Sequence, residues 1–521
     1  MGRRFGMSLL SRILEVVPDR VAGHLRELHS LDFVFPSAQE PELMYSFKHA
    51  LTQDVVYAGV LERRRRQHHA AAGRGLEELY AGRIDDVVEF LAYHFGRSAE
   101  AEKAVDYAVL AAAKAQRRWA NTEALASFED ALKRLEAMPD TEANRLRRID
   151  AVVKQSEIKF ALGRHAEQVR ALEEIRSLVD ATADPPRRAG WYYWTGFLHS
   201  ITGSRPEAPI AYCREALAIA EAARLDEIKA FAECCLTHVY AMAGDLRAAV
   251  EPGERALHAF ERQGNVWWAC RTLWGLSIAL IYLGEWERSL GYCRRALEHG
   301  EAVNDRRIKV VSWWRTGWTH IHRGDPETGV RCCQEALDLS PSPVDAAMAK
   351  AAQGYGLIRL GQVQAGTAQL AEAVAWFEQS NLHLTRSSFG VWLGDSYLLQ
   401  GERERARTIL EAVLTTSRDL GYRHLEGIAH RLLGQALRAA ESGPAARHLE
   451  TAIRILEEVG ARNEYAKALV AQAELRRAEG HSAEARRLLE RALAVFEALG
   501  TLEEPRRVQA AITALGTTRL A

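Results

Sequence analysis

The chain has 521 residues, of which 48% are hydrophobic, and its 68 basic and 69 acidic residues give a formal net charge of −1. The hydrophobic share excludes global disorder, and the balanced charge argues against a broad nucleic-acid-binding surface, which needs a basic excess. No stretch reaches the roughly 18–20 uninterrupted apolar residues that span a bilayer.

Residues 1 to about 80 show the element order of a winged helix. Residues 11–17 and 21–28 are predicted to form short helices, and residues 31–35 and 43–47 two strands joined by a polar turn. A further helix is expected from about Thr52. The order helix, helix, hairpin predicts a small winged-helix-like segment.

The most specific short motif is YSFKHALTQDVVY at residues 45–57. It resembles the motif that closes the winged-helix part of predicted signalling ATPases of the STAND/AAA type, which are often fused to class III adenylate/guanylate cyclase domains. The sequences at residues 61–68 and 92–95 resemble the same family of ATPases, in which tetratricopeptide (TPR) repeats follow this region. The resemblance implies that His49 corresponds to a histidine that senses the phosphates of a bound nucleotide. It also implies that this chain is the C-terminal half of such an ATPase, as a separate gene product or a fragment.

The chain lacks the motifs of several enzyme classes. It has no Gly-x-x-x-x-Gly-Lys-Ser/Thr and no Gly-Lys dipeptide, so no P-loop can form, and it lacks the acidic pair expected of a cyclase. It also has no Gly-x-Ser-x-Gly and no His-Glu-x-x-His. We therefore predict no enzyme activity, no catalytic residue, no metal site and no cofactor. His49 would sense a nucleotide only if an ATPase domain were supplied.

A basic run, Arg63–Arg66, lies beyond this motif. A solvated helix face is the favoured interpretation, and phosphate or nucleic-acid contact is the alternative.

From about residue 142 the chain repeats itself about every 40 residues. The signal is a glycine in a short turn after each apolar-periodic helix, at Gly163, Gly203, Gly244, Gly284, Gly324, Gly361, Gly401 and Gly480, with one further turn at residues 440–443. Small residues recur seven positions before and five positions after most of these glycines, and an Ala-Leu-like pair recurs in the second helix. Small residues at these places let two antiparallel helices approach closely. The pattern predicts tandem helical hairpins that bury their apolar faces only by stacking.

These phased positions resemble the TPR repeat. In one unit Trp313, Gly317, Gly324, Gly329 and Ala336 fill slots of its pattern. The usual period is shorter, so longer helices are expected here.

The resemblance implies an all-α protein: a right-handed TPR-like α-solenoid of about 40-residue hairpins behind the winged-helix-like segment. The predicted domains are residues 1–80, the winged-helix-like segment; 81–141, a helical linker and first TPR-like pair; and 142–521, the superhelix, with residues 505–515 as a capping helix.

In a TPR solenoid the first helix of each hairpin lines the concave groove. Counting back from the turn glycines, we predict a partner-binding groove formed by Tyr193, Phe197, His238, Arg271, Trp274, Trp314, Trp318, His322, Tyr355 and Arg359. Trp, Tyr and Arg are enriched in binding hot spots. The alternative is that these aromatic side chains fill the core between the helices. Trp274 and Trp314, one repeat apart, are expected to stack along one wall.

The predicted function is a non-catalytic TPR scaffold that holds a protein or peptide in its groove as the sensor arm of a signalling ATPase. An ATPase or cyclase domain is a possible partner in cis or in trans, with no membrane partner and nucleic acid disfavoured. One alternative is a small-ligand-sensing regulatory module; another is a fragment of an ATPase or adenylate cyclase. The seven cysteines form no Cys-x-x-Cys pair, so buried reduced thiols and a cytoplasmic location are expected, with a zinc site or disulfides as the alternative.

Overall fold

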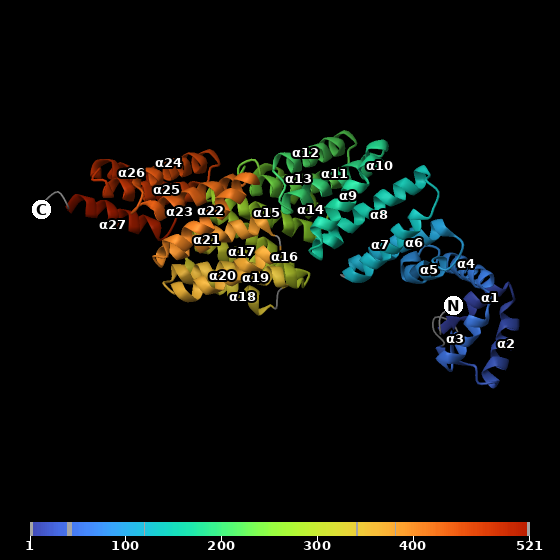
Figure 1. Ribbon diagram of the computed structural model, residues 1–521. Coiled ribbons are helices and arrows are strands. Elements are labelled where there is room, and N and C mark those ends of the chain that lie inside the picture. The colour runs from blue at the N-terminus through green and yellow to red at the C-terminus, as the bar shows by residue number, and fades with distance from the viewer. Residues whose placement is uncertain (1–3, 39–43, 119, 340–341, 381, 518–521) are drawn as a thin grey trace. The chain divides into compact units, whose positions relative to one another are not determined.

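The computed structural model describes residues 4–38, 44–118, 120–339, 342–380 and 382–517. Over these residues it contains 27 α-helices and one three-stranded sheet (Figure 1). The chain divides into two units, Met1–Ala183 and Asp184–Ala521, and each is described by itself.

The first unit begins with the sheet and continues as helices. Its elements are β1 (Arg4–Gly6), α1 (Met7–Leu14), α2 (Pro18–Ser30), β2 (Val34–Ala38), β3 (Met44–Phe47), α3 (Ala50–Gly59), α4 (Glu62–Leu79), the 3₁₀ helix η1 (Ile84–Val87), α5 (Val88–Phe95), α6 (Ala101–Arg117), α7 (Asn121–Glu136), α8 (Glu142–Ala161), α9 (His165–Glu174) and α10 (Arg176–Ala181).

The sheet is antiparallel in the order β1-β3-β2, and Phe5 pairs with Tyr45 in its register. These two side chains pack with Val21 and Leu25 of α2 and with Val34 of β2 in a small core. The two helices and the hairpin match the predicted order. The sequence does not predict β1, because three residues carry too little alternation to signal a strand, and Leu43 of the predicted second strand lies outside the described residues.

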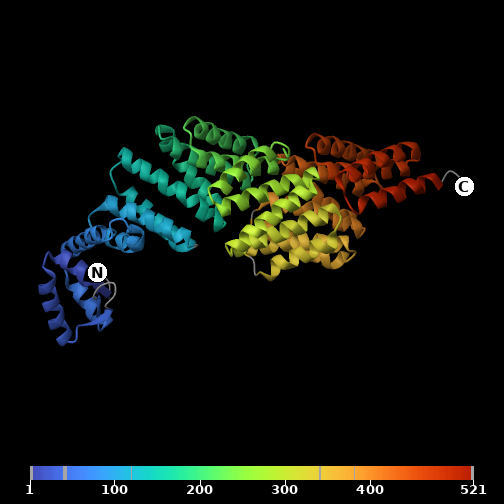
Figure 2. The same cartoon turned by 180° about the vertical axis from the view of Figure 1, so that it is seen from behind.

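The second unit is a series of helical hairpins. Its elements are α11 (Pro185–Ile201), α12 (Glu207–Ala222), α13 (Asp226–Ala243), α14 (Val250–Arg262), α15 (Val266–Leu283), α16 (Trp286–Ala302), α17 (Arg306–Arg323), α18 (Pro326–Asp338), α19 (Pro343–Arg359), α20 (Val363–Gln379), α21 (His383–Leu399), α22 (Arg403–Asp419), α23 (Arg423–Leu437), α24 (Ser442–Glu458), α25 (Arg462–Ala478), α26 (Ser482–Leu499) and α27 (Glu504–Thr517). Figures 1 and 2 show the hairpins stacked in chain order.

The turn glycines close the hairpins as the repeat predicts. All eight predicted glycines have φ between +73° and +95°, the left-handed conformation that ends a helix and that a side chain disfavours. Gly443 differs, because α24 begins at Ser442 and Gly443 lies inside that helix. The predicted turns are confirmed, with a different local conformation at residues 440–443.

The small phased residues bring the two helices of a hairpin together. A Cβ added to Gly354 of α19 would lie 2.8 Å from the carbonyl oxygen of Gly366 in α20, so a methyl group cannot fit there. In the hairpin of α17 and α18, Gly317 faces Gly329 and Cys333 in the same way. Close packing at these two positions therefore requires glycine.

Helix α27 packs on the last hairpin through Val508, Ile512 and Leu515, next to Phe496. A helix is thus present at residues 505–515, and its role as a cap stays a prediction. By length and composition one helix in the described part of the chain, α15, could cross a membrane, but 83% of its apolar window is buried inside the protein. Its apolar character is that of a helix packed on both sides by neighbouring hairpins.

Successive turns of the superhelix touch each other. A Cβ on Gly244, at the end of α13, would lie 2.9 Å from the backbone nitrogen of His424, and one on Gly324, at the end of α17, would lie 2.9 Å from that of Glu503. The backbone N–H of Leu502 donates to the carbonyl oxygen of Arg323 at 2.8 Å. The residues in each pair are about 180 positions apart. One superhelical turn therefore takes between four and five hairpins and then meets the next turn directly.

Candidate functional site

The candidate site lies along the inner helices of the second unit, the first helix of each hairpin. From α11 to α25 each inner helix contacts the next inner helix, and α15 also contacts α25. The inner helices therefore converge on the axis of the superhelix, which brings together side chains from distant repeats.

The ten predicted groove residues lie on these inner helices, and nine of them are buried. The nine are Tyr193, Phe197, His238, Arg271, Trp274, Trp314, Trp318, His322 and Tyr355. The Arg359 side chain retains 19% of its exposure. In this structure the nine side chains pack within the axis of the superhelix rather than along an open cleft. Their binding role stays a prediction.

Three of them form a first cluster on α11, α13 and α15. The guanidinium carbon of Arg271 lies 4.3 Å from the ring centre of Phe197, and the ring of His238 lies edge-on to Phe197 at 6.0 Å. His238 Nδ1 is 3.0 Å from the carbonyl oxygen of Cys234. Burial, together with the charge of Arg271, lowers the pKa of His238 to about 3, so this histidine is neutral at pH 7.

Four of them form a second, aromatic cluster around Trp392. Trp314 stacks on Trp318 at 5.9 Å, and Trp318 lies edge-on to Trp392 at 5.6 Å. His322 lies 5.4 Å from the same indole, and Tyr355 stacks on it at 4.5 Å. Trp392, on α21, thus joins side chains from α17 and α19.

Trp274 does not stack on Trp314. Its indole N–H points to Ser312 Oγ at 3.4 Å instead, because the ring of Trp314 is turned toward Trp318 within its own helix. The expectation that these two tryptophans stack along one wall is wrong.

Arg359 connects two turns of the superhelix. Its Nη2 lies 2.7 Å from Glu503 and 3.2 Å from Glu504, at the start of α27. This is an ion-pair contact over about 145 positions of sequence, next to the contact of Gly324 with Glu503.

A charged network lies beside the aromatic cluster. Arg431 of α23 and Lys467 of α25 lie 3.0 Å and 2.8 Å from the carboxylate of Glu464. Burial alone would raise the pKa of Glu464, but the two cations outweigh it and lower this pKa to about 2. Tyr355 Oη donates to Asp395 at 3.1 Å in the same region. The buried charges are thus paired, as burial in a low-dielectric interior requires.

Several polar atoms along this axis lack a hydrogen-bond partner. The indole nitrogens of Trp314 and Trp318 and Nε2 of His322 are buried without one among the described residues. His424 Nδ1 is in the same state, beside the ring of Tyr282 at 4.6 Å. Buried polar groups normally have partners, so a row of them on one helix, α17, marks a place where a hydrogen-bonding ligand could be accepted.

Sequence reasoning missed several members of this site. Trp392, His424 and Glu464 belong to repeats that follow the predicted tryptophans by 74 to 190 positions. No local signal identifies residues that the superhelix brings together.

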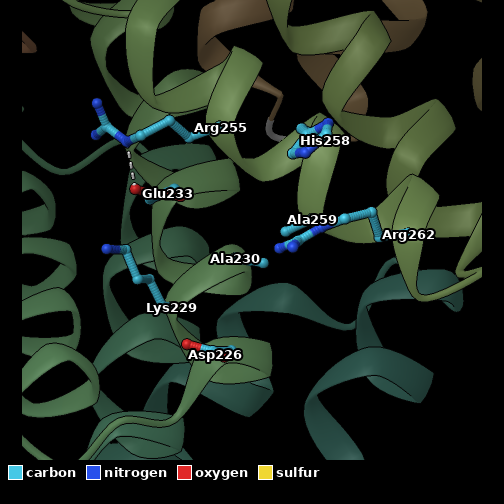
Figure 3. Close-up of a pocket in the computed structure, with 8 residues that line it drawn as sticks. All are labelled: Asp226, Lys229, Ala230, Glu233, Arg255, His258, Ala259 and Arg262. Atoms are coloured by element: carbon cyan, nitrogen blue, oxygen red, sulfur yellow. Dashed lines mark hydrogen bonds and ion pairs between the residues drawn. The ribbon is translucent and has the colours of Figure 1, made fainter.

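A separate pocket of about 260 Å³ lies between α13 and α14 (Figure 3). It is lined by Asp226, Lys229, Ala230, Glu233, Arg255, His258, Ala259 and Arg262. Arg255 Nε lies 2.6 Å from the buried carboxylate of Glu233. Burial, partly offset by Arg255, raises the pKa of Glu233. Arg262 has no ion-pair partner among the described residues and adds a cation to this wall.

His49 is exposed at the residue before α3. The seven cysteines are unpaired and buried, as predicted. Among the described residues, no group of three or more His, Cys, Asp or Glu side chains is arranged to hold a metal ion.

Comparisons with known proteins assign the fold. Residues 390–417 match the family model described as tetratricopeptide repeat. No curated protein matches the chain in sequence. Among solved structures, NprR in complex with its cognate peptide NprX is similar over 68% of this chain and 99% of its own, at 12% identity and a TM-score of 0.51. The APC/C hetero-tetramer Cut9–Hcn1 is similar over 90% and 93%, at 12% identity and a TM-score of 0.50.

A STAND protein with a tetratricopeptide repeat sensor from Pyrococcus horikoshii aligns with 83% of this chain and 63% of its own, at 12% identity and a TM-score of 0.49. Together with the helical hairpins, the family match and the first two structures show that the chain folds as a TPR-like α-solenoid, as the sequence predicts.

Proposed function

We propose that the solenoid is a non-catalytic scaffold that binds a peptide or protein partner along its inner helices. The observation that carries the proposal is the row of buried, unpartnered polar atoms on α17, including the indole N–H groups of Trp314 and Trp318. An extended peptide supplies a backbone carbonyl at every residue, which is the acceptor that an indole N–H needs. NprR, which shares the fold, has been solved with its cognate peptide.

The buried state of these residues sets a condition for binding. A peptide reaches Trp318 only if the contact between superhelical turns opens, at Arg323 with Leu502 and at Arg359 with Glu503. These two contacts are a backbone hydrogen bond and a partly exposed ion pair, which together contribute a few kcal/mol on an order-of-magnitude scale. The packing of His424 on Tyr282 and of α15 on α25 adds to them, so a partner must make several new hydrogen bonds to open the superhelix.

Selection from a phage-displayed peptide library against the full chain tests this proposal. Trp318→Phe keeps an aromatic ring but removes the N–H, so we expect selected peptides to bind about tenfold more weakly, as the loss of one hydrogen bond implies. Arg271→Ala is expected to weaken binding as well, and Trp376→Ala, on the outer helix α20, is the matched control. Equal affinity in all variants would show that the inner helices do not bind the peptide.

We further propose that the first unit is a winged-helix remnant and that the chain acts in the cytoplasm as the arm of a STAND-type signalling ATPase, in cis or in trans. The motif at residues 45–57 and the order strand, helix, helix, hairpin support this. We propose that the winged-helix-like segment ends at residue 80 and that the helical linker with the first TPR-like pair ends at residue 141. Calorimetric titration of ATP into the chain alone should give no heat of binding. Measurable phosphate release would contradict the non-enzymatic assignment.

A small-ligand sensor is the second candidate, and the pocket between α13 and α14 favours it (Figure 3). Lys229, Arg255 and Arg262 outnumber Asp226 and Glu233 there, so a small carboxylate or phosphate is the class of ligand that fits. A thermal-shift screen of metabolites separates the two candidates, because Arg262→Ala should abolish a shift that arises in this pocket and leave peptide binding unchanged.

A further inference from the structure

Helix α3 exposes its apolar side chains to an unusual degree. None of its ten residues is buried. Leu51, Val55 and Val56 are 76%, 65% and 57% exposed, and Leu61, in the turn that follows, is 73% exposed. Leu51 and Val55 are four residues apart and so lie on the same side of the helix. Exposed apolar residues grouped in this way mark interaction surfaces.

The contacts of α3 with the first unit are few. Tyr57 Oη lies 2.9 Å from His69 Nε2 on α4, and Arg65 lies 5.3 Å from the Tyr57 ring centre. A helix of ten residues is marginal in water on its own, and most helices are stabilised by burying an apolar face. The apolar face of α3 is not buried within this unit, so an external surface that covers it would stabilise the helix.

Helix α5 also exposes apolar side chains. The ring of Tyr93 lies 5.7 Å from that of His69, which Tyr57 of α3 also contacts. Tyr93 is half-exposed, and Phe90, one turn earlier in α5, is 61% exposed. Helices α3 and α5 thus both contact His69 and both expose apolar side chains, which is the kind of surface that an amphipathic helix covers.

The border of this surface is basic. Arg63 and Arg64, in the first turn of α4, are exposed and have no ion-pair partner among the described residues. Arg97 stacks on the Tyr93 ring at 3.9 Å. The amino end of α4 adds partial positive charge at the same place. The acidic residues nearby are Asp54 of α3 and Glu62 of α4, and Glu62 already pairs with Arg66. Cations therefore predominate, and a complementary partner carries carboxylates.

We propose that α3, the turn at Leu61 and the exposed aromatic residues of α5 form a docking surface for an amphipathic helix of a partner protein with an aliphatic stripe and Asp or Glu along its flank. Leucine side chains of that helix cover Leu51, Val55 and Phe90. Its carboxylates pair with Arg63 and Arg64. This surface belongs to the first unit, whereas the inner helices belong to the second.

Two synthetic helical peptides test the proposal on the full chain. Both carry leucine at helical spacing; one has glutamate and the other lysine at the flanking positions. By fluorescence anisotropy we expect the glutamate peptide to bind at least tenfold more tightly, with the difference falling as salt rises. Equal affinity of the two peptides, or no binding of either, overturns the proposal.

Substitutions locate the binding. Leu51→Ser with Val55→Ser should weaken the glutamate peptide at least tenfold, and Arg63→Glu with Arg64→Glu should reverse the preference between the two peptides. Leu399→Ser, another exposed leucine, is the control. These residues are exposed, so the variants should fold, and circular dichroism checks this.

Three other outcomes count against a helical protein partner. If phosphatidylserine vesicles or duplex DNA bind in place of the peptide, and the same variants abolish that binding, the surface recognises a membrane or a nucleic acid instead. If the wild-type chain dimerises in sedimentation and Leu51→Ser with Val55→Ser makes it monomeric, the occupant is a second copy.

Discussion

The contact between superhelical turns can be tested with a pair of glycine substitutions. Gly324 and Gly361 end inner helices with φ of +95° and +85°, so alanine strains the backbone similarly at both positions, by about 1–2 kcal/mol. A Cβ at Gly324 would lie 2.9 Å from the backbone nitrogen of Glu503, whereas one at Gly361 meets nothing within 4 Å. The difference between the two variants therefore isolates the contact between turns.

The size of this difference in unfolding free energy follows from the interactions that are lost when Glu503 and its neighbour Leu502 are displaced. The hydrogen bond from Leu502 N–H to Arg323 is worth roughly 1 kcal/mol, and the partly exposed ion pair of Arg359 with Glu503 contributes at most about as much. We therefore expect Gly324→Ala to cost about 1–3 kcal/mol more than Gly361→Ala in the free energy of unfolding of the second unit.

Urea unfolding and hydrogen exchange read out the two parts of this prediction. Both variants should lower the urea midpoint, Gly324→Ala by more. Amide exchange in residues 502–508 should accelerate only in Gly324→Ala, because only there is the start of α27 displaced. Equal midpoints and equal exchange in the two variants would refute the direct contact between superhelical turns.

Three further predictions follow from the packing. Arg359→Ala should lower the free energy of unfolding by about 1 kcal/mol in urea titrations, because it removes the ion pairs with Glu503 and Glu504 across the superhelical turns and leaves these carboxylates only their pairs with Arg507. Arg405→Ala, at an exposed pair with Glu402, should change it by less than about 0.5 kcal/mol. Gly354→Ala should lower the free energy of unfolding by about 1–3 kcal/mol, because a methyl group meets the Gly366 carbonyl. Gly443→Ala, at an open helical position, should raise it by up to about 1 kcal/mol. The opposite order of thermal midpoints would contradict the close approach of α19 and α20. Burial lowers the pKa of His322 and His424 to about 3, below the ordinary value near 6.5, so the folded state binds fewer protons than the unfolded state between these two values. The stability of the folded state is therefore complete above about pH 6.5 and falls as the pH drops toward 3. Urea midpoints should decline between pH 7.5 and pH 5, and His424→Phe should make this decline smaller.

The repeat could be predicted because its signals are local. The position of a glycine such as Gly284 after an apolar-periodic stretch predicts the end of a helix, and φ of +80° there confirms it. The fixed offsets of Gly354 and Gly366 from the turn predict that the two helices of the hairpin approach each other closely. These features depend on a single hairpin, whose two helices lie next to each other in the chain.

The candidate site was predicted less completely. The phase of the repeat placed Trp318 and Tyr355 on inner helices, as observed, but phase alone left open whether they face a groove or fill the core. The structure buries both against Trp392. The pairing of Glu464 with Arg431 also has no local signal, because 33 residues separate the two and each alone looks like an ordinary surface charge.

The sequence by itself determined the tandem hairpins and their 40-residue phase, because both follow from short-range periodicity and turn chemistry. Only the tertiary structure decided how tightly the superhelix winds. Small rotations between neighbouring hairpins accumulate until Gly324 contacts Glu503, and the sequence of a single repeat does not predict these rotations. That winding places the aromatic side chains inside the superhelix, so the binding that we propose along the inner helices requires the superhelix to open.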